Sequence, residues 1–412
     1  MDATAKRLAR SLERLYARVP LGMRLGLEAM RAACERAGNP ESAFDCVHVA
    51  GTNGKGSVSA MIASVARASG RRTGLYTSPH LARFAERIRI DGEPISDADL
   101  VAVLERALDV GHDLSFFETA TLAAFFAFRD ARVELAVLEV GLGGRLDATN
   151  VIARSRASVI TRIALDHEDR LGHTLPEIAR EKAAIAKPGC PLLVGRVPPD
   201  VREAIAGVAE PLGASVQFLD DVARETIPAL PHLPGAYQAD NAEVAWLACR
   251  ALGLDAHVER GLREARWPGR FERLTTPEGD VLLDAAHNED GALALVASLA
   301  AEPRPGGEPS PVALVFGSLA DKHFALTLPV VARIAVADAR FYVEPKGRAA
   351  APPSALSKVA QGHEMPSLSE ALRAARARVG KGGLVVVCGS VYLVGEARAL
   401  LLGEPTDPPV AL

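Results

Sequence analysis

Residues 47–57 are the stretch that most constrains how this chain can fold. Their sequence, VHVAGTNGKGS, runs from an apolar strand-like segment through three glycines into a helical apolar pattern. Strand, glycine-rich turn and helix are the layout of a phosphate-binding loop, in which backbone N–H groups and the helix N-terminus hold an anion. Lys55 can reach the outer phosphates and Ser57 can face a magnesium ion, although Gly56 between them departs from the strict Walker spacing. A plain surface turn is the alternative, and the flanking strand and helix argue against it.

The rest of the chain repeats strand-like runs followed by helical patterns, which predicts an α/β fold with a mainly parallel sheet and helices on both faces. The strand-like runs of the first part are 73–77, 133–140, 157–161 and 191–194. A proline and a glycine at positions 268 and 269 break this alternation, and a new one begins at 281–284. We therefore predict two domains: a P-loop-type sheet in residues 1–269 and a smaller Rossmann-like α/β domain in residues 270–412. In the second domain we expect strands near 312–317, 333–337, 341–343 and 384–388, with helices near 290–301, 324–332, 367–379 and 391–402.

Composition argues against several classes of function. Lys and Arg number 47 against 51 Asp and Glu, a net charge of −4, so no basic surface argues for nucleic acid. The five cysteines are widely separated and form no CxxC pair, which supports neither a disulfide framework nor structural zinc. No apolar run is long enough to span a membrane, and the first residues lack the apolar core of a signal peptide. We therefore expect a cytoplasmic protein without a membrane partner.

Polar side chains stand at the ends of three predicted strands. Ser78 follows the strand 73–77, Glu139 ends the next, and His167 comes just past a third. A strand-end glutamate is costly to bury without a cation or several donors, and the carboxyl ends of parallel strands share one edge of a sheet. Alone, His167 fits a hydrogen-bonded surface histidine better, but the neighbouring oxygen ligands favour a metal. Oxygen ligands with one imidazole suit Mg²⁺ or Mn²⁺ better than zinc.

Three further residues are ambiguous when they are read alone. Lys182 follows an arginine and a glutamate on a predicted helix and has the pattern of a solvated lysine. Asp284 ends the first strand of the second domain, where it either faces the phosphate site across a cleft or caps a helix; the local sequence favours neither. Arg270 stands at the domain boundary, from which its side chain could swing onto bound phosphates.

Eight segments stand out by their length and specificity: AGTNGKGS, TSPHLARFAERIRIDGEPIS, SFFETAT, EVGLGGRLDATN, ALDHEDRLGHTLPEIAREKAAIAKPG, WPGRFE, DAAHN and VVVCGSVYLVGEAR. In their order and approximate spacing they resemble the folylpolyglutamate synthase/dihydrofolate synthase family of the Mur-ligase superfamily. The resemblance runs from about Leu15 to Leu401. The departure from the Walker spacing is the form that this family has.

The resemblance implies an ATP-dependent amide ligase that adds L-glutamate to dihydropteroate, to the glutamate tail of folates, or to both, through an acyl phosphate. It makes residues 1–269 a Mur-ligase central-type domain with pterin-binding loops and residues 270–412 the glutamate side of the cleft. The implied ATP contacts are Thr52, Asn53, Gly54, Lys55, Gly56, Ser57, Asn241, Arg270 and Asp284. Two Mg²⁺ ions, with Mn²⁺ as an alternative, have the implied ligands Ser78, Glu139, His167 and Lys182. Lys182 would be N6-carboxylated, and the resulting carbamate overturns its reading as a solvated lysine.

The family's substrate positions also carry over residue by residue. The implied pterin contacts are Ser115, Phe116, Phe117, Glu118, Leu146, Asp147 and Ala148, and the implied glutamate contacts are His287 and Ser390. Lys55, Lys182 and His287 are the residues expected to take part in catalysis. Two departures affect the cleft wall: Tyr237 stands where a histidine often precedes the glutamine, and DAAHNE stands in place of the usual D-G-A-H-N-P. Neither departure removes a proposed charge.

Three other functions would use a similar loop: a different Mur-superfamily amino acid ligase, a small-molecule kinase, and a nucleotide-dependent binding protein without turnover. The pterin-contact segments argue against the first, and the complete set of proposed metal ligands argues against the last. A kinase would release a stable phosphoester instead of an amide. We expect a monomer with small-molecule substrates. Whether the chain performs one of the two glutamate additions or both stays open.

Overall fold

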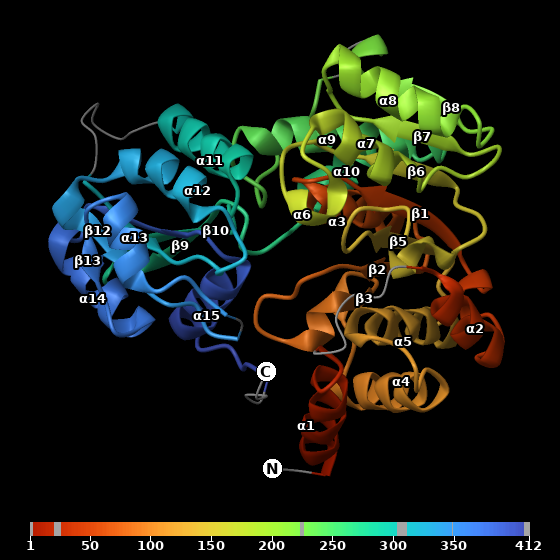
Figure 1. Ribbon diagram of the computed structural model, residues 1–412, viewed down its shortest axis with the longest axis horizontal. Coiled ribbons are helices and arrows are strands. Elements are labelled where there is room, and N and C mark those ends of the chain that lie inside the picture. The colour runs from red at the N-terminus through yellow and green to blue at the C-terminus, as the bar shows by residue number, and fades with distance from the viewer. Residues whose placement is uncertain (1–2, 20–25, 223–225, 303–310, 348, 408–412) are drawn as a thin grey trace.

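The computed structural model describes residues 3–19, 26–222, 226–302, 311–347 and 349–407, and Figure 1 shows them as two lobes side by side. Within these residues the larger lobe contains an eight-stranded sheet in the order β4-β3-β2-β5-β1-β6-β7-β8. Its strands are β1 (Asp45–Ala50), β2 (Thr73–Tyr76), β3 (Ile88–Ile90), β4 (Glu93–Pro94), β5 (Leu135–Glu139), β6 (Ala157–Ile160), β7 (Pro191–Val194) and β8 (Ser215–Phe218). Its α-helices are α1 (Ala3–Tyr16), α2 (Glu28–Arg36), α3 (Lys55–Ala68), α4 (Asp97–Val110), α5 (Phe116–Asp130), α6 (Glu168–Leu171), α7 (Leu175–Ala183), α8 (Pro199–Ala209), α9 (Tyr237–Ala251) and α10 (Val258–Glu264).

The sheet of the larger lobe is mainly parallel and is covered on both faces. Strands β2, β5, β1, β6, β7 and β8 run parallel, and β3 and β4 extend the sheet antiparallel at one edge. Helices α3, α9 and α10 share one core with apolar side chains of the central strands. The opposite face is covered by α1, α4 and α5 over one half of the sheet and by α7 and α8 over the other. The predicted fold class is confirmed for this lobe.

The register of the parallel strands brings several loops to one edge of the sheet. β1 is buried from its second residue to its last, as expected for a central strand with helices on both faces. Val49 pairs with Glu139, and Ala50 pairs with Ile160, so β1, β5 and β6 end at nearly the same level. Ligands of open α/β sheets bind at this carboxyl edge. The glycine-rich loop, Glu139 and the segment after β6 therefore face the same space.

The smaller lobe contains, in its described part, a six-stranded sheet in the order β13-β12-β11-β14-β10-β9. Its strands are β9 (Glu272–Thr276), β10 (Gly279–Asp284), β11 (Val312–Phe316), β12 (Arg340–Tyr342), β13 (His363–Glu364) and β14 (Leu384–Cys388). Its α-helices are α11 (Glu289–Ala301), α12 (Phe324–Val331), α13 (Pro353–Val359), α14 (Leu368–Val379) and α15 (Val391–Leu402). Only β9 is antiparallel to its neighbour, and Figure 1 shows α11 and α12 above the sheet and α15 below it. The predicted smaller Rossmann-like lobe is confirmed.

One predicted strand of the smaller lobe is wrong. The chain at 333–337 forms parts of two 3-10 turns, Ala332–Ile334 and Ala337–Ala339, instead of a strand. The Arg340 guanidinium Nε donates to the carbonyl oxygens of Ala332 at 3.1 Å and Ala335 at 2.9 Å, which holds this segment in a curve. Val336 is 61% exposed, so the apolar run there does not belong to a buried strand. Apolar composition alone does not separate the two arrangements.

We propose that the boundary between the two domains lies between residues 269 and 270, as the sequence predicts. Among the described residues the last strand of the first sheet ends at Phe218, and helices α9 and α10 still pack on that sheet. The second sheet begins with β9 at Glu272. The boundary therefore falls in the short connection between α10 and β9.

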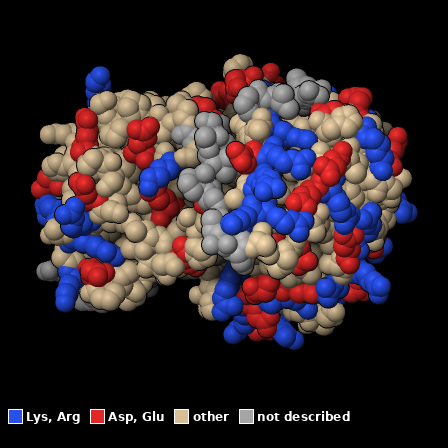
Figure 2. All heavy atoms as spheres, turned by 90° about the horizontal axis from the view of Figure 1, so that it is seen from below, with Lys and Arg blue, Asp and Glu red and all other residues tan. Residues whose placement is uncertain are grey.

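The surface of the larger lobe is charged and mixed in sign. Figure 2 shows basic and acidic side chains interspersed over the face seen from below. Several pair across elements, as Arg7 does with Glu105 and Arg14 with Asp109 between α1 and α4. Solvent screens exposed pairs of this kind, so they contribute little to stability. Within the described ranges, no helix has both the length and the apolar character needed to cross a bilayer.

Candidate active site

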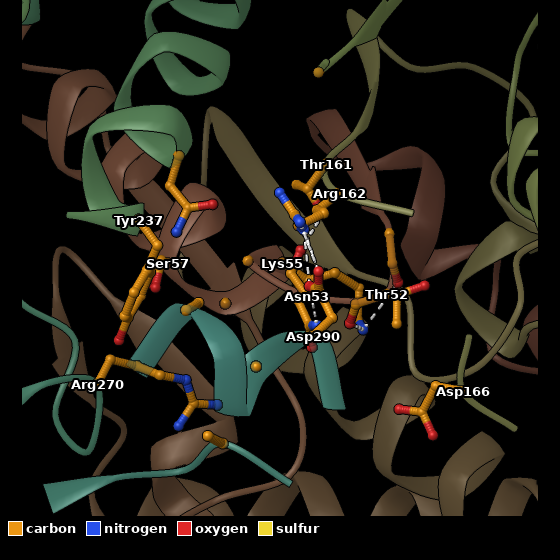
Figure 3. A pocket seen from close by; sticks show the side chains of 18 of the residues that line it. Thr52, Asn53, Lys55, Ser57, Thr161, Arg162, Asp166, Tyr237, Arg270 and Asp290 are labelled. Atoms are coloured by element: carbon orange, nitrogen blue, oxygen red, sulfur yellow. Dashed lines mark hydrogen bonds and ion pairs between the residues drawn. The ribbon is translucent and has the colours of Figure 1, made fainter. Parts of the chain in front are cut away.

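A cavity of about 580 Å³ lies between the two lobes, at the carboxyl edge of the larger sheet. The glycine-rich loop 51–57 forms one wall, together with the metal-ligand candidates. The smaller lobe supplies the facing wall through Arg270, Asp284 and His287. All the residues predicted to bind ATP or metal line this cavity, and Figure 3 shows several of their side chains converging on it.

The glycines of the loop are required by close contacts. Gly54 has φ of +86° and precedes the first turn of α3, a conformation that other residues rarely adopt. A Cβ atom at Gly54 would collide with the Asn241 side-chain oxygen, and one at Gly51 would collide with the Thr161 hydroxyl. At Gly56, a Cβ atom would lie 2.6 Å from Nε1 of Trp267, whose indole therefore rests directly on the loop. The loop is thus packed tightly against β6, α9 and the domain connection.

A half-buried lysine, Lys55, and a buried one, Lys182, donate to the same loop carbonyl. Lys55 Nζ donates to the Gly51 and Thr52 oxygens, each at 3.1 Å, and Lys182 Nζ donates to the Gly51 oxygen at 2.9 Å. Burial lowers the pKa of Lys55, although Glu139 and Asp166 partly oppose this. Burial and the Lys55 charge lower the pKa of Lys182 to about 7. Two ammonium groups this close favour an anion in the cavity.

Glu139 and His167 have the character of metal ligands. Glu139 is 4% exposed, and burial raises the pKa of its carboxyl group although Lys55 and the Ser78 N–H lower it. Its Oε2 accepts from the Ser78 backbone N–H at 3.0 Å. Burial lowers the pKa of His167 to about 4, so its imidazole is neutral near pH 7, and its Nε2 lies 3.2 Å from Lys322 Nζ, which a metal ion would replace. The described residues contain no group of three or more His, Cys, Asp or Glu side chains that could hold a metal ion. A cation here would also need oxygen ligands such as Ser78, which fits Mg²⁺ or Mn²⁺.

The wall of the smaller lobe is tied to the larger lobe through Asp284. Its Oδ2 accepts from the Tyr237 hydroxyl at 2.7 Å and from the Phe271 N–H at 2.9 Å, and its Oδ1 accepts from the Ala286 N–H at 2.8 Å. Asp284 therefore caps no helix; the cap of α11 is Asn288, whose side chain accepts from the Gly291 N–H. Next to this wall, Asn241 donates to Gln238, which in turn donates to Ser57.

Sequence reasoning missed a group of charged and amide residues that crosses between the lobes. Lys322 Nζ lies 2.7 Å from Asp166 Oδ1 and 3.2 Å from His167 Nε2. Burial would raise the pKa of Asp166, but His287, Lys322 and His167 together hold it well below its usual range. Asp166 had a signal, since it directly precedes His167. Lys322 had none, because it is far away in sequence and joins the site only through the fold.

Comparisons with known proteins decide the family. Models of the Mur ligase middle domain and of the Mur ligase glutamate ligase domain match residues 49–189 and 269–391. The chain is 35% identical to the dihydrofolate synthase/folylpolyglutamate synthase of Escherichia coli K12, over 92% of this chain and 91% of that protein. The chain belongs to the folylpolyglutamate synthase/dihydrofolate synthase family. The predicted family is confirmed.

Two further comparisons concern a longer relative and a solved structure with ligands bound. A probable bifunctional folylpolyglutamate synthase/dihydropteroate synthase of Haloferax volcanii is 37% identical over 90% of this chain, which spans only 48% of that longer protein. A crystal structure of a bifunctional folylpolyglutamate synthase/dihydrofolate synthase with Mn, AMPPNP and L-glutamate bound has a TM-score of 0.81 at 32% identity. The two chains are covered to 93% and 95%. The fold and the two-lobed arrangement of this family member are thus those of a solved synthase.

The residues predicted to contact the pterin lie outside the set that lines the cavity between the lobes. Ser115 and Glu118 form a capping box at the start of α5, and Asp147 accepts from the N–H groups of Leu142 and Thr149. Phe116 packs in the core beside α1, Leu146 is half-buried, and Ala148 is buried. The Phe117 ring lies against Gly141, which does line the cavity. Ser390 caps α15. Their contact with substrate stays a prediction.

Proposed function

We propose that this chain joins the amino group of L-glutamate to a carboxylate of dihydropteroate or of a reduced folate, while ATP becomes ADP and phosphate. The observation that carries the proposal is the meeting of Lys55, Glu139 and Asp284 on one cavity between two lobes. A carboxylate oxygen attacks the γ-phosphorus of ATP, and ADP leaves. The amine of glutamate then attacks the carbonyl carbon of the acyl phosphate, phosphate leaves, and the amine loses a proton.

The glycine-rich loop and Lys55 would hold the phosphates. A carboxylate that approaches ATP brings two anions together, so positive charge fixed at that point lowers the barrier. Lys55, which is half-buried, and Arg270 at the domain boundary both line the cavity. The backbone N–H groups of residues 53–57 and the N-terminus of α3 add partial positive charge. Asn241 on α9, beside the loop, and Asp284 on the smaller lobe are the further residues assigned to the nucleotide.

Ser78, Glu139, His167 and Lys182 would hold two divalent cations, Mg²⁺ with Mn²⁺ as a substitute. When bound, these ions neutralise phosphate charge and fix the orientation of the γ-phosphate. Lys182 could serve only as a carbamate, since an ammonium group does not bind metal. With its pKa near 7, a large fraction of the Lys182 amine is neutral in the cell. A neutral amine adds to CO₂ to give a carbamate and releases one proton, and bound cations would stabilise that anion.

The substrates would enter from two sides. His287 lines the cavity from the smaller lobe, and Ser390 lies at the N-terminus of α15, the side assigned to L-glutamate. The pterin would lie near Phe117 and residues 146–148, so that its carboxylate reaches the loop past Gly141. Closure of the two lobes would exclude water, which otherwise hydrolyses the acyl phosphate. This enzyme would act as a cytoplasmic monomer.

One assay tests the proposal and separates its rivals. The protein is incubated with ATP, Mg²⁺, labelled L-glutamate and either dihydropteroate or tetrahydrofolate monoglutamate, and the products are identified by mass. Amide products with equal amounts of ADP and phosphate are expected, and the substrate that reacts tells which glutamate additions the chain performs. A phosphorylated acid without amide would favour a kinase. Nucleotide binding with no product would favour a binding protein.

A further inference from the structure

The tip of the phosphate-binding loop is held by the smaller lobe. Asn53 uses both ends of its side-chain amide across the lobe boundary. Its Nδ2 donates to Asp290 Oδ2 at 2.8 Å and to Asn288 Oδ1 at 3.1 Å, and its Oδ1 accepts from Asn288 Nδ2 at 3.1 Å. The smaller lobe thus contacts a residue that is assigned to ATP.

Asp290 is in turn held by Arg162, which follows β6 in the larger lobe. Arg162 Nε lies 2.7 Å and 2.8 Å from the two carboxylate oxygens of Asp290, and its Nη2 lies 2.6 Å from Oδ1. The Asp290 side chain is 19% exposed and that of Arg162 is 60% exposed. Figure 3 shows Arg162 and Asn53 reaching Asp290 from the same side. The loop is fixed to Arg162 as well, because Thr52 N–H donates to the Arg162 carbonyl at 2.7 Å.

The placement of Asp290 raises an electrostatic difficulty. Asp290 lines the same cavity as Lys55 and the glycine-rich loop, so its carboxylate would lie beside the phosphates of a bound nucleotide. Like charges placed together in an interface cost several kcal/mol. The two-pronged contact from Arg162 cancels the carboxylate's charge and leaves it free to accept from Asn53. Glu289, directly before Asp290, stands where the family pattern has proline.

We propose that Arg162 and Asp290 are a positioning pair that docks α11 of the smaller lobe on the phosphate-binding loop and sets the orientation of Asn53. Arg162 neutralises the Asp290 carboxylate, which can therefore lie beside the nucleotide phosphates. Asp290 gives the loop its contact with the smaller lobe. The inference rests on the proposed binding of ATP in this cavity and adds two residues to it.

The test is a double-mutant cycle that neutralises each charge in turn. It compares four proteins: the wild type, Arg162→Gln, Asp290→Asn and the double variant. Arg162→Gln uncovers the carboxylate, and we expect the Kd for Mg-ADP, measured by calorimetry, to rise about tenfold. Asp290→Asn removes the charge but keeps an acceptor for Asn53, so its Kd should stay within about threefold of the wild type. In the double variant no carboxylate remains to repel the phosphates. Its Kd should return to within about threefold of the wild type, which makes the two substitutions strongly non-additive.

Kinetics and a control complete the experiment. The KM for ATP should follow the Kd across the four proteins, while kcat changes less. Arg378→Gln is the matched control, because Arg378 makes a similar two-bond contact with Asp338 within the smaller lobe, away from the cavity; nucleotide binding should not change. The inference is overturned if Arg162→Gln binds Mg-ADP like the wild type, or if the double variant binds as weakly as Arg162→Gln. A wild type that binds nucleotide with the expected pattern but forms no amide would leave the inference standing and overturn the proposed function.

Discussion

The cavity edge and the segment near residues 115–118 and 147 both bury polar side chains, but they satisfy them in different ways. Glu118 Oε2 accepts from the Ser115 N–H at 2.8 Å and from its hydroxyl at 2.6 Å. At the cavity edge, Lys55 and Lys182 donate to loop carbonyls instead of carboxylates, and burial lowers both pKa values. Buried polar groups whose hydrogen bonds are all made within the protein stabilise the fold. Buried charged groups that lack a charged partner are costly to keep and indicate a site for a ligand. Substitutions in the two regions should therefore affect different quantities.

The largest effect is expected at Lys55. Replacing it with methionine should lower kcat/KM by about 10²–10³-fold, because a preorganised positive charge at the phosphates is lost. Stability should not fall, since burial already disfavours the charged amine and methionine fills a similar volume. Steady-state kinetics and thermal unfolding of the same preparation measure both. A large loss of stability would show that Lys55 stabilises the fold, as the polar residues near 115–118 and 147 do.

Glu139→Gln should come next. The carboxylate is the only acidic group among the four proposed metal ligands before Lys182 is modified, and we expect activity to fall about 10²-fold. The Mg²⁺ concentration needed for half-maximal rate should also rise. Glu134→Gln is the control at the other end of β5, where Glu134 accepts from the Arg72 N–H at an exposed site. If the Glu139→Gln variant needs the same Mg²⁺ concentration as the wild type, Glu139 is not a metal ligand.

In the satisfied region the effect should appear in stability. Asp147→Ala leaves the N–H groups of Leu142 and Thr149 without their acceptor, which should cost about 1–3 kcal/mol of unfolding free energy. Asp147→Asn should cost less, because burial raises the pKa of Asp147 and a neutral side chain is tolerated there. Urea unfolding followed by circular dichroism measures both variants. Equal losses in the two would mean that the charge itself is needed.

The smallest effect is expected for Ser115→Ala, which removes the cap of α5 and should cost about 1 kcal/mol. Ser367→Ala at the cap of α14 is a matched loss in the smaller lobe. If Ser115 also contacts the pterin, only its variant should raise the KM for dihydropteroate. If both variants have the same KM for dihydropteroate, Ser115 only caps α5 and does not contact the substrate.

The sequence predicts those parts of the site that are local. Strand, glycines and Lys55 are contiguous, and Glu139 and Ser78 follow recognisable strands, so the edge of the sheet could be placed from pattern alone. Lys182 gave no local sign of its burial, which depends on α7 packing against the loop. Asn288, Asp290 and Lys322 reach the site only because the smaller lobe docks there, and no periodicity encodes that docking. The prediction for 333–337 failed for a different reason: the nearby Arg340 side chain fixes the path of this segment, and an apolar pattern does not show that contact.

The indole of Trp267 against Gly56 has a practical consequence. The chain has two tryptophans, and the other, Trp246, is half-buried on α9 and packs against the core of the larger lobe. Replacing Trp246 with phenylalanine would leave one tryptophan, Trp267, seated on the loop and on the connection between the lobes. This tryptophan can be excited selectively at wavelengths that tyrosine does not absorb. Its emission would then change as nucleotide enters, which gives an optical signal of loading and closure without any added dye.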